Sequence, residues 1–109
     1  MQVVKNTHMK LVIVTSVEEF QNDVLKLFKK ANIESFSSYD IDGHKNIPSV
    51  LITASWFPGK TGGNESYLFF SFTDDDHIEN LFNLIKIFNK NLETNNPVKA
   101  VVLPIEKHI

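Results

Sequence analysis

The sequence contains no cysteine, and this absence excludes several kinds of chemistry. Disulfide bonds, thiolate zinc sites and thiol catalysis all depend on cysteine side chains. Histidine, aspartate and glutamate are therefore the only side chains left as ligands for a metal ion.

The chain also lacks a strong charge and a long apolar run. Its formal net charge is −2 at pH 7, and no stripe of basic residues is present. Because binding to nucleic-acid phosphates needs clustered lysine and arginine, we expect no nucleic-acid partner. No apolar stretch is long enough to span a bilayer, and residues 1–8 do not resemble a signal peptide. We therefore expect a cytoplasmic protein without direct insertion into a membrane.

What the chain does contain is enough apolar material for a core. It has 109 residues, of which 42% are hydrophobic and 22% charged, and nine are phenylalanine. This length and composition predict one folded domain. We assign it to residues 9–109 and treat residues 1–8 as an N-terminal extension or a remnant of cloning.

Hydrophobic periodicity predicts four strands and two helices. We expect strands at residues 10–15, 33–42, 66–73 and 98–105. One helix follows the first strand and another follows the third. The order is β-α-β, a long loop, then β-α-β, which predicts an α+β, ferredoxin-like βαββαβ fold with an antiparallel sheet.

Short signals predict where the helices begin and end. Ser16 and Glu19 fit a capping box at the start of the first helix, and Asn32 is a suitable residue for its end. Thr73 is placed to cap the second helix. Residues 74–76 are all aspartate, which the positive end of a helix dipole favours.

The predicted sheet has two apolar faces. Successive side chains of a strand point to opposite faces, and the first, third and fourth predicted strands are apolar at consecutive positions. Two helices can cover only one face of a small sheet, and a second copy of the chain is the simplest cover for the other. We expect four residues to need that cover: Tyr67, Phe69, Val101 and Leu103.

The connection 43–64 is longer than roughly 12–15 residues, a length at which loops are usually functional or mobile. Trp56 and Phe57 within it either anchor the loop or contact another protein, and the sequence leaves both interpretations open. Lys60, at the glycine-rich tip, is a candidate contact for an anion.

Residues 54–61 (ASWFPGKT) fit a relaxed phosphate-loop pattern. A true phosphate loop wraps backbone N–H groups around a phosphate and continues into a helix. Here Pro58 has no N–H, and Gly62-Gly63-Asn64 follows in place of a helix. No nucleophile with its base and no pair of catalytic carboxylates stands out, so we predict that the chain is not an enzyme.

Asp40, Asp42 and His44 alternate, so they point the same way in an extended segment. Two carboxylates and an imidazole are suitable ligands for a divalent metal ion. The alternative, which we favour, is a solvated strand end that leads into a turn.

With these elements placed, the chain resembles the PII-like signalling proteins. Residues 9–15 (MKLVIVT) look like the first strand of that family, and residues 99–106 (KAVVLPIE) look like its last. The long connection 43–64 lies where the family carries its T-loop.

This resemblance implies a non-enzymatic homotrimer whose open sheet faces pack around a three-fold axis. It implies a sensor that binds a small ligand in clefts between subunits and engages a partner, often a membrane transporter, through the loop. The candidate ligands are a nucleotide and a divalent metal ion. The ligand-binding residues that we expect are Asp42, His44, Lys60 and, from the neighbouring subunit, Thr94, Asn95 and Asn96.

The chain departs from the family in two places. Residues 93–97 (ETNNP) replace the glycine-rich nucleotide loop, and no tyrosine lies between Gly43 and Ser66. We therefore expect a divergent branch that does not sense ATP and 2-oxoglutarate in the family's usual way. A CutA-like trimeric metal-tolerance protein and an amino-acid-binding ACT-type module predict the same secondary structure and remain alternatives.

Overall fold

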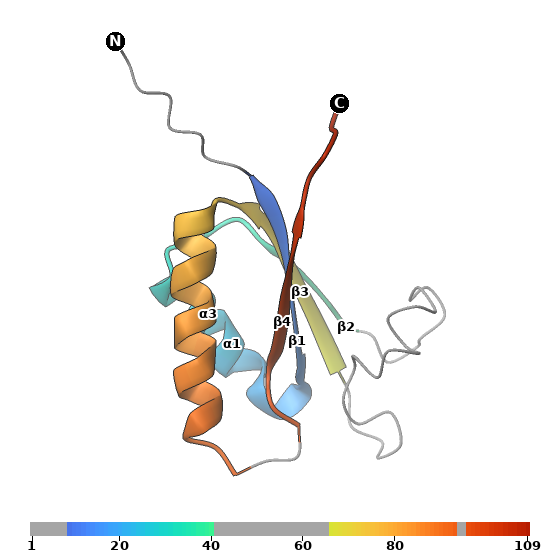
Figure 1. Cartoon of the computed structure of the whole chain (residues 1–109). Helices are drawn as coiled ribbons and strands as arrows, with labels where there is room; N and C mark the ends of the chain where they lie inside the picture. Colours follow the sequence, from blue (N-terminus) through green and yellow to red (C-terminus); the bar gives the residue numbers. More distant parts are fainter. Residues whose placement is uncertain (1–8, 41–65, 94–95) are drawn as a thin grey trace.

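The structure of the protein is a computed structural model, which defines residues 9–40, 66–93 and 96–109. These residues form an antiparallel sheet with two helices packed on the same face (Figure 1). The elements are, in chain order, β1 (Lys10–Val17), the short 3-10 helix η1 (Glu18–Phe20), α1 (Gln21–Lys30), β2 (Ser37–Asp40), β3 (Ser66–Thr73), α3 (Asp75–Lys90) and β4 (Lys99–Pro104).

The sheet has the strand order β2-β3-β1-β4, and every neighbouring pair is antiparallel. Each βαβ unit is therefore split by a strand from the other unit, which is the ferredoxin-like arrangement. The predicted fold class is confirmed. β1 lies between β3 and β4, so that Ile13 pairs with Phe70 on one side and with Val101 on the other.

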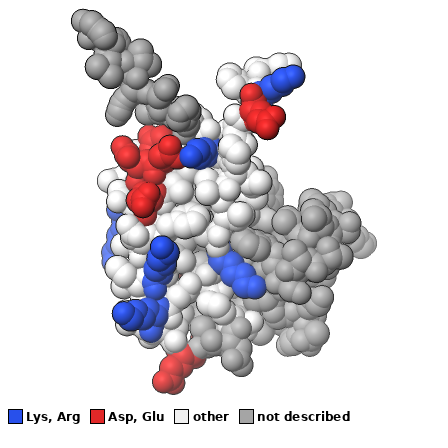
Figure 2. Space-filling view, in the orientation of Figure 1, with Lys and Arg blue, Asp and Glu red and all other residues white. Residues whose placement is uncertain are grey.

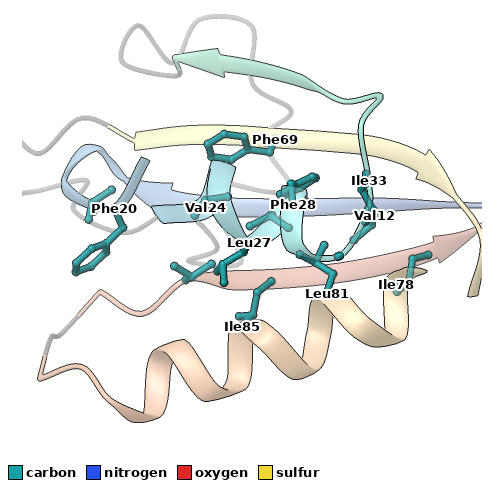
Figure 3. Packing of buried hydrophobic residues seen from close by; sticks show 14 residues of the cluster. Val12, Phe20, Val24, Leu27, Phe28, Ile33, Phe69, Ile78, Leu81 and Ile85 are labelled. Atoms are coloured by element: carbon teal, nitrogen blue, oxygen red, sulfur yellow. The ribbon is translucent and has the colours of Figure 1, made fainter. Parts of the chain in front are cut away.

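The hydrophobic core lies between the sheet and the helices (Figure 3). The largest fully buried apolar side chains come from β1, β3 and both helices: Val12, Val14, Val24, Phe28, Phe69 and Leu81. The rings of Phe28 and Phe69 lie 5.8 Å apart between centroids, and Phe36 lies 4.8 Å from Phe28. These aromatic contacts join α1, β3 and the segment before β2 into one core.

The position of Phe69 corrects our expectation about the uncovered face. Phe69 is paired with Val14, lies under the helices and is fully buried, so it needs no second copy to cover it. Tyr67 lies on the same face and packs against the core. Val101 and Leu103 belong to the opposite face, because β4 pairs Ala100 with Val14 and thereby turns its odd-numbered residues away from the helices.

The predicted start of the first helix is also wrong. β1 continues to Val17, and Ser16 is a fully buried strand residue paired with Tyr67. The chain then turns through η1 before α1 begins at Gln21, and no side chain caps the start of either of these two helices. The pairing of β1 with β3 therefore overrides the local capping signal of Ser16.

The end of α1 follows the prediction. Asn32 has a φ of 61°, in the left-handed region that asparagine tolerates better than most residues. The Asn32 N–H donates to the Lys29 carbonyl at 3.0 Å, and the Ile33 N–H donates to the Phe28 carbonyl at 2.9 Å. This is a Schellman motif. Because Ile33 is held by α1 and buried in the core, β2 begins later than predicted, at Ser37.

Asp74, and not Thr73, caps α3. Thr73 is still paired with Lys10 in the sheet, while Asp74 is extended and its Oδ1 atom accepts a hydrogen bond from the His77 N–H at 3.0 Å. The same oxygen lies 2.7 Å from Nδ1 of His77. The side-chain hydrogen bond from His77, followed by the backbone one, holds the pKa of Asp74 below its ordinary value.

Replacing Asp74 with alanine should reduce the free energy of unfolding by about 1 kcal/mol at pH 7, because the first turn of α3 loses its cap. The substitution Asp74→Asn should cost less than Asp74→Ala, since asparagine keeps a capping oxygen but lacks the negative charge. The two variants and the native chain are compared by urea denaturation at equal protein concentration.

The same comparison has a defined pH dependence. Because the pKa of Asp74 is lowered in the folded state, its contribution is complete well above the unfolded value of 3.8 and disappears as the pH falls through the lower, folded pKa. The difference between native and Asp74→Ala proteins should therefore shrink in acid. A difference that stays constant as the pH falls through both pKa values would contradict a role for the ionised carboxylate.

Candidate functional site

The face of the sheet turned away from α1 and α3 is apolar, and we call it the open face (Figure 1). Its large side chains are half-buried or exposed: Leu11, Ile13, Tyr39, Leu68, Phe70, Phe72, Val101 and Leu103. Three of them are unusually accessible for their type, with exposed fractions of 55% for Tyr39, 54% for Phe72 and 42% for Leu103. Contiguous apolar surface of this kind marks interaction sites in soluble proteins.

Aromatic side chains form a continuous row on this face. The ring of Tyr39 stacks on that of Phe70 with a centroid distance of 5.9 Å, and Phe70 meets Phe72 edge to face at 6.2 Å. The row runs from the edge strand β2 along β3. Preformed aromatic surface is typical of the centres of protein–protein interfaces.

The open face ends in a groove of about 1040 Å³ where β1 begins and β4 ends. Met9, Phe72, Pro104 and Ile105 give it apolar walls, while Lys10 and residues 106–108 give it charged and polar groups. Lys10 is already paired with Asp75, whose Oδ1 lies 2.7 Å from its Nζ. The groove therefore extends the apolar surface toward the C-terminal residues and carries little net charge.

The charged side chains at the two ends of α3 interact favourably with the helix dipole. The acidic Asp75 and Asp76 occupy the first turn and Lys90 the last. Figure 2 shows the acidic side chains near one end of α3 and lysines toward the other. No large patch of one sign forms on the part of this face that is described.

Most residues predicted to bind a ligand or partner lie outside the described residues, so those predictions stay predictions. They are Asp42, His44, Trp56, Phe57, Lys60, Thr94 and Asn95. Of the described ones, Asp40 is the exposed last residue of β2 and Asn96 is half-buried shortly before β4. Within the described part of the chain, no three histidine or acidic residues are grouped to bind a metal ion.

The sheet places Asp40 and the start of β4 at the same end but on opposite edges. Asp40 pairs with Tyr67 and Tyr67 with Ser16, while Lys99 pairs with the adjacent Thr15. Three strand spacings separate β2 from β4, which is about 14 Å across the sheet. In a single copy, Asp40 and the first residues of β4 are therefore separated by the width of the sheet.

Two features at this end of the molecule could not be predicted from the sequence. The side-chain amide of Asn89 forms a pair of hydrogen bonds with the backbone of Val98. In addition, the hydroxyls of Thr15 and Ser16 are buried, and neither has a hydrogen-bond partner among the described residues. Buried polar groups are normally paired, so these two hydroxyls are exceptions on the central strand.

Across residues 9–40, 66–93 and 96–109, no helix combines the length and the apolar character needed to cross a bilayer.

The chain is similar to known proteins in its fold but not in its sequence. No family model and no curated protein matches the chain. Among solved structures, it is similar to CPII, a nitrogen regulatory PII-like protein from Thiomonas intermedia, in a structure with ADP, AMP and bicarbonate. The identity is 9%, 93% of this chain and 96% of the other are covered, and the TM-score is 0.56.

A putative PII-like signaling protein from Thermus thermophilus is similar to the same degree. It shares 13% identity over 91% of this chain and 88% of its own, with a TM-score of 0.57. At such identities the likeness concerns the fold. The resemblance to PII-like proteins that the first and last strands indicated is thus confirmed as a shared fold.

Replacing Thr15 tests whether its buried hydroxyl lacks a hydrogen-bond partner in solution. An unpaired buried hydroxyl costs roughly 1–3 kcal/mol, so Thr15→Val should leave the free energy of unfolding unchanged or raise it by about 1 kcal/mol. The matched control is Ser71→Ala. Ser71 is also buried, but its hydroxyl donates to the Ser35 carbonyl, so its loss should destabilise by about 1 kcal/mol.

Both variants are measured by chemical denaturation at one protein concentration. If Thr15→Val destabilises as much as Ser71→Ala, the Thr15 hydroxyl is hydrogen-bonded in solution and the structural assignment is wrong.

Proposed function

We propose that this chain is a divergent PII-like regulatory protein. It acts without catalysis, as a cytoplasmic homotrimer that binds a small ligand between subunits and signals to a protein partner. The observation that carries the proposal is the open face, an apolar surface on the side of a PII-like fold that neither α1 nor α3 covers.

The chemistry of the open face supports assembly from copies of the chain. Tyr39, Phe72 and Leu103 expose large apolar side chains, and covering them with like surface removes them from water. Soluble homo-oligomers are usually closed and symmetric, and each copy brings the same face to the assembly. Three copies around an axis cover three open faces at once.

The positions of Asp40 and β4 support a ligand cleft between subunits. Asp40 and the start of β4 lie at one end of the sheet on opposite edges, so an assembly that sets the β2 edge of one subunit beside the β4 edge of the next would bring these two segments together. In the proposed cleft, Asp42, His44 and Lys60 of one subunit face Thr94, Asn95 and Asn96 of the next. One copy alone offers only half of this cleft.

The proposed ligand is a nucleotide or a divalent metal ion. ADP, AMP and bicarbonate are present in the structure of CPII, which makes them the first compounds to test. The proposed partner contacts Trp56 and Phe57 in the 43–64 segment, and a membrane transporter is the kind of partner that we favour. A CutA-like metal-binding trimer is the alternative, and it would respond to metal ions but not to nucleotides.

Replacing Phe72 with aspartate should dissociate the trimer and leave the subunit folded. Phe72 lies on the open face and makes little contact with the core, so an added charge opposes burial in an interface but not folding. Light scattering should give about three chain masses for the native protein and about one for the variant. Circular dichroism should show native helix content in both.

The control for this experiment is Phe69→Ala, which removes a fully buried ring from the same strand. It should reduce the free energy of unfolding by about 3–5 kcal/mol, in contrast to Phe72→Asp. A native protein that scatters as a monomer at micromolar concentration would refute the trimer.

The ligand part of the proposal is tested by thermal shift with ADP, AMP, bicarbonate and divalent metal ions, each added alone. A compound that binds the native state, present at about 100 times its Kd, adds about 2.7 kcal/mol to stability and raises the melting temperature. We expect a nucleotide to do so, and we expect deletion of residues 55–63 to reduce that shift while the trimer persists.

A shift with metal ions alone would favour the CutA-like alternative. If the deletion changes neither ligand response nor partner binding, the 43–64 segment is only a connection and its proposed role is wrong.

A further inference from the structure

We infer that a groove at the β2 edge of the sheet is a docking site, and that its occupant is the end of β4 from a second copy of the chain. The inference rests on the assembly part of the proposed function and names the contact that joins neighbouring copies. The groove lies between residues 34–37 and the end of β3, and we call it the edge groove. The segment that it receives is 103–107.

The edge groove exists because the chain leaves the sheet before β2 begins. Ser37 pairs with Phe70, so Phe36 would be the next residue to pair and would lie opposite Ser71. Phe36 packs instead against the hydrophobic core, and the Ser35 carbonyl accepts a hydrogen bond from the Ser71 hydroxyl. Among the described residues, no strand therefore pairs with the last part of β3 on this edge.

The edge groove has an aromatic wall and a polar rim. Its volume is about 450 Å³, and it is lined by residues 34–37 on one side and by residues 70–72 on the other. Phe70 and Phe72 belong to the aromatic row of the open face. Glu34 is exposed at the rim, and none of the described lining residues is lysine or arginine. The groove therefore suits an apolar segment that is followed by a positive charge.

The end of β4 and the residues after it have this character. Leu103 is an exposed residue of the open face, and Ile105 is the next residue in the same alternation. Pro104 between them has no N–H, so the segment docks through its side chains and not by extending a backbone ladder. Lys107 is exposed and has no ion-pair partner within the described part of the chain. Figure 1 shows the chain projecting beyond the sheet after β4.

The strand register brings the edge groove and this segment to the same end of the sheet. One line across the four strands joins Ser37, Phe70, Ile13 and Val101. Because β2 and β4 run antiparallel, the residues before Ser37 and those after Val101 extend from this line in the same direction. When the β2 edge of one copy lies beside the β4 edge of the next, the groove faces residues 103–105 of that next copy.

The same segment of the groove's own copy lies on the opposite edge of the sheet. Three strand spacings, about 14 Å, separate β4 from the edge that carries the groove. The segment that fills the groove therefore comes from a second copy.

Disulfide cross-linking tests the contact, because the chain has no cysteine of its own. The variant Ser35→Cys/Ile105→Cys carries both cysteines in one chain and is oxidised mildly as the intact protein. We expect covalent dimers and trimers on a non-reducing gel, since the groove of each copy holds the segment of the next. Only monomeric bands would overturn the inference, and an internal disulfide would show that the groove holds the segment of its own copy.

Two controls accompany this variant. Ile105→Cys alone should give no covalent trimer, because one cysteine per chain can link at most two copies. In Asn22→Cys/Ile105→Cys, the first cysteine replaces an exposed residue of α1 that does not line the groove. It should give no covalent trimer either. A covalent trimer in this control equal to that of Ser35→Cys/Ile105→Cys would show random collision and refute the docking.

A second experiment exchanges the charges of Glu34 and Lys107. Glu34→Lys and Lys107→Glu should each raise the concentration at which the assembly dissociates by about threefold or more, because like charges replace an ion pair. The double variant should restore the native value, as measured by light scattering over a dilution series. Glu79→Lys, at an exposed position on α3, makes the same change in net charge and should have no effect. If Glu34→Lys dissociates no more readily than Glu79→Lys, Lys107 does not approach Glu34.

Failure of this inference can be distinguished from failure of the proposed function. A native protein that scatters as a monomer refutes the assembly, and this contact with it. A native trimer in which Ser35→Cys/Ile105→Cys forms no link between copies keeps the assembly and refutes only the docking of residues 103–107 in the edge groove.

Discussion

The double pairing of β1 is the constraint on which the rest of the structure depends. β3 and β4 are aligned to the same strand, so one register decides which apolar residues face the helices. Val14 brings Phe69 and Ala100 to the helix-covered face, and Ile13 brings Phe70 and Val101 to the open face. A shift of one residue in either pairing would exchange the buried set for the exposed one.

The same register explains why function is proposed for an assembly and not for one copy. It leaves an aromatic row on the open face and places the ends of β2 and β4 on opposite edges. The first feature favours contact between copies, and the second separates Asp40 from the start of β4 by the width of the sheet. The aromatic row follows from the register and the edge positions follow from the strand order. Neither feature involves a reactive side chain.

The ends of α3 are held by side chains that bond to backbone groups. Asp74 accepts from the His77 N–H at the first turn, and Asn89 pairs with Val98 at the last. At both ends the helix meets a strand after a short connection, where the ordinary backbone ladder cannot continue. Polar side chains satisfy these groups, and the second of them joins the last turn of α3 to the residue before β4.

The sequence by itself determined the order of the elements, the ferredoxin-like class, the end of α1 at Asn32 and the presence of two apolar sheet faces. These are local properties, because periodicity and the left-handed cap depend on neighbouring residues. Only the tertiary structure decided that Phe69 is buried, that Ser16 belongs to a strand, that Asp74 replaces Thr73 as the cap and that Asn89 binds Val98. Each of these depends on a strand pairing or a contact between residues of different elements, and the local pattern is the same for either choice of face.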